Sequence, residues 1–142
     1  MRWPSAALVF ATATAMLTAS CGDTPSPTAP TETTTTSSVT FIGTLDAGGA
    51  RFYSFTLTTA GTVTALLASV TSTAGLPVSS ALELGVGVPA GTGCAASTTQ
   101  VVTAALLSQV STSLPAGTFC LRVADTGLLA GPVTFAVRFT HP

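Results

Sequence analysis

The feature that most constrains the fold is an alternation of apolar and polar residues from Val39 to the end of the chain, broken about every 8 to 12 residues by Gly or Pro. Successive side chains of a strand point to opposite faces, so this alternation predicts strands with one buried face. Residues 51–58 show it most clearly, with Tyr53, Phe55 and Leu57 on one face. Seven or eight short strands of this kind predict an antiparallel β-sandwich, of jelly-roll or immunoglobulin-like type, over residues 39–142.

Two parts of this segment are harder to assign. Residues 89–97, which include Cys94, are rich in Gly and are predicted to form a loop. Residues 100–113 fit either one helical turn or two strands with a kink. Gly85 and Gly87 share the polar face of an alternating run, which predicts a bulge or the close approach of another segment. The predicted strands lie at 41–45, 51–58, 62–70, 82–88, 119–123 and 133–140.

The first 20 residues are typical of a bacterial export signal. Arg2 supplies a positive charge, and residues 6–17 are uncharged, mostly small or apolar, and too few to span a bilayer. Residues 17–21, Leu-Thr-Ala-Ser-Cys, resemble a lipobox, in which the Cys receives diacylglycerol before cleavage. This predicts a lipoprotein signal peptide over 1–20 and lipidation of Cys21. The alternative is an ordinary signal cleaved near Ala19 or Ser20.

Cysteine parity and the next segment agree with a lipid anchor. Removing Cys21 from the three cysteines leaves an even pair, Cys94 and Cys120, which we expect to form a disulfide in an oxidising compartment. The alternative is two free thiols. Residues 22–38 contain seven Thr, three Ser and three Pro, and so little apolar surface that they are predicted to be a disordered tether. The expected location is outside the cytoplasm, anchored by lipid to the cell envelope.

Charge excludes one class of partner. The chain has four arginines, five acidic residues and no lysine, and they are scattered. Without a basic patch to neutralise phosphates, a nucleic acid is not an expected partner.

Catalytic chemistry has little support in the sequence. The single histidine, His141, is next to the C-terminus, and no Gly-x-Ser-x-Gly motif is present. Asp46 and Asp125 both occur in predicted turns and could meet at one end of a sandwich, either to hold Ca²⁺ or to serve a glycosidase. The alternative is that each carboxylate binds backbone amides of its own turn. We therefore expect no catalytic residue, no metal and no cofactor.

Three side chains on outward faces are candidates for ligand binding. Phe52 is the one aromatic residue of the folded part that falls on a polar face. Arg122 and Arg138 lie on the outward faces of two predicted strands and could form a binding pair, or they could be separately solvated.

Several runs resemble the bacterial pre-peptidase C-terminal-like domain, a family similar in architecture to collagen-binding domains. The resemblance covers nearly all of residues 39–142 and consists of strand and turn signatures. It implies a β-sandwich that serves as an accessory module of exported proteins. Arg51 departs from the family pattern, which often has an acidic residue at this place, and we expect no attached catalytic domain. The matching runs are 43–45, 48–49, 53–57, 60–63, 115–123 and 131–135.

Three functions remain to be weighed. The leading hypothesis is a non-catalytic lipoprotein whose sandwich is a binding or adhesion module for an extracellular polymer or an envelope protein. The second is a structural role in which the domain associates with copies of itself, because no lysine guards the strand edges. The third, an enzyme, would require a carboxylate pair at a catalytic separation.

Overall fold

The computed structural model describes Thr35–Pro142. The predicted signal peptide, the lipidation of Cys21 and the predicted tether as far as residue 34 lie outside the described residues. The described residues contain both sheets and one hydrophobic core, and so form a compact unit. Its strands are β1 (Ser37–Leu45), β2 (Ala50–Leu57), β3 (Gly61–Ser72), β4 (Leu82–Ala90), β5 (Gly93–Val102), β6 (Val110–Leu114), β7 (Gly117–Asp125) and β8 (Val133–His141).

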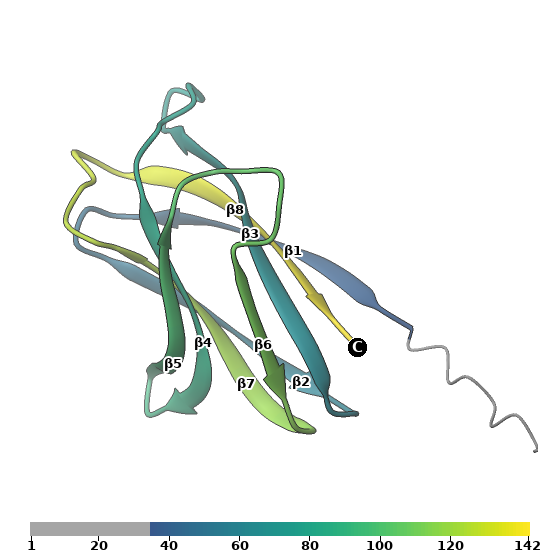
Figure 1. The fold of residues 1–142 in the computed structure, drawn as a ribbon. Coiled ribbons are helices and arrows are strands. Elements are labelled where there is room, and N and C mark those ends of the chain that lie inside the picture. Colours follow the sequence, from purple (N-terminus) through teal and green to yellow (C-terminus); the bar gives the residue numbers. More distant parts are fainter. Residues whose placement is uncertain (1–34) are drawn as a thin grey trace, which may run out of the picture. The chain divides into compact units, whose positions relative to one another are not determined.

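The strands form two antiparallel sheets that pack face to face (Figure 1). One sheet has the order β1-β8-β3-β6 and the other β2-β7-β4-β5. This is the strand order of an eight-stranded jelly roll. The predicted all-β sandwich is therefore confirmed, and the topology is the jelly-roll alternative rather than the immunoglobulin-like one.

The core is the apolar layer between the sheets. Alternating residues of β8 and β7 supply its centre, with Phe135 and Phe139 facing Leu121, and each of these three side chains is fully buried. Aromatic rings join the two layers near β1 and β2, where Phe55 lies 4.3 Å from Phe139 between ring centroids. The described residues bury no polar side chain completely. This separation of polar and apolar faces is what the alternating pattern predicts.

The structure differs from the predicted boundaries at three places. Ser37 and Ser38, assigned to the tether, belong to β1 and pair with β8. Residues 89–97 were predicted as a loop, but Pro89 and Ala90 end β4 and residues 93–97 are the first half of β5. The prediction was wrong because β5 is an edge strand of small residues that buries little apolar surface. Residues 103–109 form a loop between β5 and β6, so residues 100–113 contain two strands and no helical turn.

A disulfide holds β5 across the outer face of its sheet. Cys94 bonds to Cys120, with 5.9 Å between their Cα atoms, although β4 lies between β5 and β7 in the sheet. Gly87 of β4 is the residue opposite Cys120, and a Cβ built on it would lie 1.9 Å from the carbonyl oxygen of Ala95. A bulge between Val86 and Gly87 lets β5 bend over this glycine. The bulge and close approach expected at Gly87 are both present.

We predict that Gly87→Ala destabilises the domain by about 1 to 3 kcal/mol, because the new methyl group forces β5 away from β4. The free energy of unfolding, measured by urea denaturation of the oxidised protein, checks this. Gly131→Ala is the matched control, since a Cβ there meets no atom within 4 Å. Equal stability of the two variants would contradict the close approach.

Candidate functional site

Two of the three predicted ligand-binding residues lie together. Phe52 of β2 is directly opposite Arg122 of β7, on the outer face of the sheet. Arg122 donates a hydrogen bond to Glu83 of β4 and forms an ion pair with it. An ion pair this exposed contributes about 0 to 1 kcal/mol to stability, and it occupies the guanidinium that a ligand would need. This face offers a half-exposed ring beside a neutralised charge.

Arg138 is not part of that group. It lies on β8, between Thr40 of β1 and Leu66 of β3, and its side chain is exposed. Strand β8 belongs to the opposite sheet from β7, so the outer faces that carry Arg138 and Arg122 point away from each other. A binding pair of the two arginines is therefore wrong, and Arg138 stands as a separate solvated side chain.

Asp125 uses its carboxylate to hold two loops. One oxygen accepts a hydrogen bond from the amide of Gly48, at 2.7 Å, and the other accepts from the amides of Gly127, Leu128 and Leu129. Hydrogen bonds from Gly48 and the other amides lower the pKa of Asp125, against a smaller desolvation effect. Asp125 therefore binds backbone amides of its own turn, which is one of the alternatives that the sequence left open. Among Thr35–Pro142, no three His, Cys, Asp or Glu side chains are grouped to hold a metal ion.

The connections of the sandwich gather at its two ends (Figure 1). We call one the loop end; it is formed by residues 46–49, 73–81, 103–109 and 126–132. The beginning of β1 and the end of β8 lie at the opposite end of the sandwich. There Ser37, the first residue of β1, pairs with His141, the last residue of β8. The chain therefore enters and leaves the domain at the end opposite the loop end.

Four exposed leucines lie on three of these long connections. Leu106 and Leu107, at the tip of 103–109, are 94% and 79% exposed. Leu76 in 73–81 is 66% exposed, and Leu128 in 126–132 is 63% exposed. Leu76 and Leu128 lie on the loops at the loop end itself. Leu106 and Leu107 lie farther back, beside the middle of β3, because Ala105 and Gln109 on either side of them donate to the carbonyls of Leu67 and Ala65.

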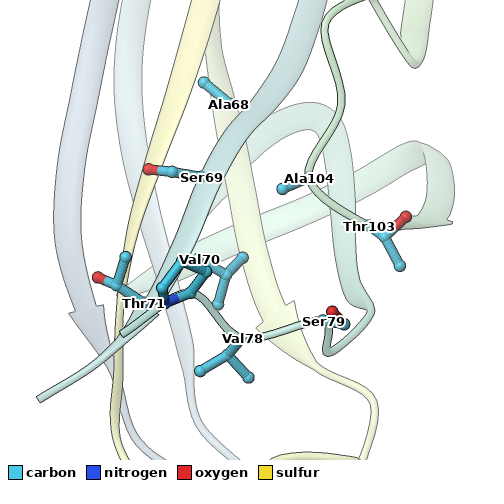
Figure 2. Close-up of a pocket in the computed structure, with 9 residues that line it drawn as sticks. Ala68, Ser69, Val70, Thr71, Val78, Ser79, Thr103 and Ala104 are labelled. Carbon is cyan, nitrogen blue, oxygen red and sulfur yellow. The ribbon is translucent and has the colours of Figure 1, made fainter. Parts of the chain in front are cut away.

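A cavity of about 380 Å³ lies between loops 73–81 and 103–109. Figure 2 shows Val70 and Val78 on one side of it and Ala104 on the other. It borders the half of β3 that extends beyond β6, next to the irregularity between Leu67 and Ser69. Its lining is uncharged, with aliphatic groups and hydroxyls of Ser and Thr: Ala68, Ser69, Val70, Thr71, Pro77, Val78, Ser79, Thr103 and Ala104.

A second cavity, of about 390 Å³, lies on the other side of loop 73–81. Val78 lines both cavities, so this loop separates them. Loop 126–132 forms the opposite wall, through residues that include the exposed Leu128. The lining of this cavity is also uncharged. The two cavities and the loop between them form one uncharged, partly apolar surface.

Backbone hydrogen bonds fix the loops that wall the first cavity. In loop 73–81, the amide of Val78 donates to the carbonyl of Val70 at 2.9 Å. In loop 103–109, the amide of Ala105 donates to the carbonyl of Leu67, at 3.0 Å. The Gln109 side chain then accepts a hydrogen bond from the amide of Leu67, at 2.8 Å, and donates to the carbonyl of Thr103. These bonds hold both walls in place, so the cavity is preformed.

Sequence reasoning did not find this surface. The run from Ala104 to Leu107 is apolar, and an apolar run favours a buried element. Its position at a loop tip depends on where β5 ends and where β6 pairs with β3. The cavity residues are Ser, Thr, Ala and Val, which carry no recognisable binding motif.

Comparison with known proteins adds no assignment: no protein-family model matches the chain, and no curated protein matches it significantly. In the part of the chain that the structure describes, no helix has the length and apolarity needed to cross a bilayer.

We predict that Asp125 makes stability depend on pH. The folded-state pKa is below the ordinary value of 3.8, so the carboxylate stabilises the fold above pH 3.8, and this stabilisation is lost as the pH falls through the folded-state pKa. Asp125→Asn should lower the melting temperature at neutral pH and flatten its decrease down to about pH 2. Asp46→Asn is the control, because Asp46 accepts its turn hydrogen bond through the backbone. Parallel pH curves for wild type and Asp125→Asn would refute the prediction.

Proposed function

We propose that this chain is a non-catalytic, lipid-anchored envelope protein whose jelly-roll domain binds a ligand at its loop end. The observation that carries the proposal is the position of two uncharged cavities, together with the exposed Leu76 and Leu128, at the end opposite Ser37. A domain attached at one end presents its opposite end to partners. Binding residues are often carried on loops that a rigid scaffold positions, and both conditions apply here.

The chemistry of the loop end supports an uncharged ligand. The cavity linings combine Ser and Thr hydroxyls with aliphatic side chains and carry no charge. Hydroxyls offer hydrogen bonds to the hydroxyl or amide groups of a polymer, while valine and leucine cover its apolar parts. An extracellular polysaccharide or an uncharged segment of an envelope protein fits this surface better than a phosphorylated or strongly acidic partner.

The export signal and the resemblance to pre-peptidase C-terminal-like domains support the same proposal. Residues 17–21 supply the lipobox-like sequence, and the Thr/Pro-rich residues that follow provide a spacer between lipid and domain. Modules of that family accompany exported proteins. The jelly-roll topology is compatible with the resemblance, which rests on strand and turn residues.

We predict that the isolated domain, Thr33–Pro142, binds saturably to at least one of three immobilised probes: purified peptidoglycan, collagen, or an uncharged polysaccharide. Ala104→Trp should weaken this binding at least about tenfold, because the indole fills the first cavity. Ser111→Trp, on the exposed outer face of β6, is the matched control and should bind normally. Surface plasmon resonance measures the affinities.

Two results would count against the loop end. If Phe52→Ala abolishes binding and Ala104→Trp does not, the ligand site is the outer face of β2 and β7. If the folded domain binds none of the probes, the adhesion role fails for these ligand classes.

We also predict that the wild-type chain, expressed in a bacterium, incorporates radiolabelled palmitate and sediments with membranes, and that Cys21→Ser abolishes both. Serine lacks the thiol that carries the diacylglycerol, and without the acyl chains the domain loses its hydrophobic anchor. Cys94→Ser, which removes a cysteine of the folded domain, should retain the label. Label on Cys21→Ser would refute lipidation at this residue.

A further inference from the structure

A sandwich of this kind has four edge strands, and each one exposes backbone groups that can pair with another chain. Here they are β1 and β6 in one sheet and β2 and β5 in the other. Proteins protect such edges with lysines, inward charges, short strands, bulges or covering loops. This chain has no lysine, so its edges must be protected by the other devices.

Side chains of β2 cover part of the β1 edge. The Arg51 guanidinium donates to the carbonyl of Thr44 at 2.9 Å, and the Tyr53 hydroxyl donates to the carbonyl of Ile42 at 3.3 Å. Burial raises the pKa of Tyr53 despite the opposing charge of Arg51, so the hydroxyl remains a donor at neutral pH. A Cβ at Gly43 would lie 2.3 Å from this hydroxyl, so a larger residue there would displace the Tyr53 side chain.

The edge of β6 is protected by its length and by a loop. The strand has five residues, Val110–Leu114. Beyond Val110 the edge of β3 is covered by loop 103–109, through the hydrogen bonds of Ala105 and Gln109 to Leu67. Little of this edge remains for another strand.

Strand β5 differs from β6 and from the part of β1 that Arg51 and Tyr53 cover. Its first half bends over β4 at the bulge, but Thr98–Val102 runs in uninterrupted register with β4. It is the last strand of its sheet, so the far side of this segment faces no other strand of the described domain. It contains no charge and no proline. Val101, on the outer face, is 60% exposed.

We infer that Thr98–Val102 pairs antiparallel with the same segment of a second copy of this chain, about a two-fold axis at Gln100. This pairing joins the two β2-β7-β4-β5 sheets into one continuous sheet of eight strands. It does not depend on the ligand proposed for the loop end.

The segment is complementary to itself. About the two-fold axis, Gln100 faces its own copy, Thr99 faces Val101, and Thr98 faces Val102. Both members of each pair lie on the same face of the joined sheet, as antiparallel pairing requires. The Thr–Val pairs are between β-branched residues, which stabilise cross-strand contacts, and no like charges are brought together. A second copy therefore matches this edge with the residues already present.

Charge at the symmetry axis tests the inference. Sedimentation equilibrium of Thr33–Pro142 should give a mass that rises toward the dimer with concentration. Gln100→Lys and Gln100→Glu should each raise the dissociation constant by at least about tenfold, because each places like charges opposite one another. Mixing these two variants should restore a dimer containing one copy of each. Gln100 is exposed and no side-chain hydrogen bond ties it to the fold, so circular dichroism should show that both variants fold.

Matched controls separate this edge from the opposite one. Ser38→Lys and Ser38→Glu place the same charges on exposed β1 and should dimerise like wild type. Oxidation of Gln100→Cys should trap a covalent dimer, since opposite Cα atoms in an antiparallel pair are close enough for a disulfide. Oxidation of Ser38→Cys should not.

Three outcomes would overturn the inference. One is a wild-type domain that remains monomeric at every concentration, which leaves the edge to an extended segment of a different protein. The second is a dimer that persists in Gln100→Lys. The third is loss of the dimer through the Ser38 substitutions instead, which would place the contact at β1.

Discussion

The bend of β5 across Gly87, held by the Cys94–Cys120 disulfide, is the constraint on which the rest of the domain depends. Closing a loop with a sequence separation of 26 residues stabilises a fold by about 3 to 4 kcal/mol. That is a large share of the net stability of a domain of this size. Directly after this bend, β5 runs in uninterrupted register with β4 through Thr98–Val102 and is followed by loop 103–109. The open edge at Thr98–Val102 and one wall of the first cavity therefore both belong to the segment that follows this crossing.

Scarcity of charge explains how the domain treats its edges. Because the chain has no lysine, individual side-chain contacts protect its sheet edges. Arg51 and Tyr53 cover part of the β1 edge, and Gln109 helps to cover the β3 edge beyond β6. The same scarcity leaves both cavities at the loop end uncharged, lined by hydroxyls and aliphatic side chains. Both proposals, an uncharged ligand at the loop end and pairing of two copies at β5, follow from this property.

Much of the fold was predictable, because strands with one fully buried face have a strong period of two. The runs ending in Leu57, Val123 and Phe139 were assigned correctly for this reason. Strand β5 was missed because its side chains are small and its pattern weak, so only pairing with β4 identifies it as a strand. For the candidate site, the pairing of Arg122 with Arg138 failed, since consecutive strands β7 and β8 lie in different sheets.

The sequence by itself determined the all-β class, the inward faces of most strands and the glycine needed near a bulge, because each depends on side-chain alternation or local backbone geometry. It also supplied the two cysteines of the disulfide. Only the tertiary structure decided which strands are neighbours, which outward residues share a face, and where cavities form. These depend on contacts between segments far apart in the chain, such as Leu67 with Gln109 and Gly48 with Asp125, and local patterns carry no information about them.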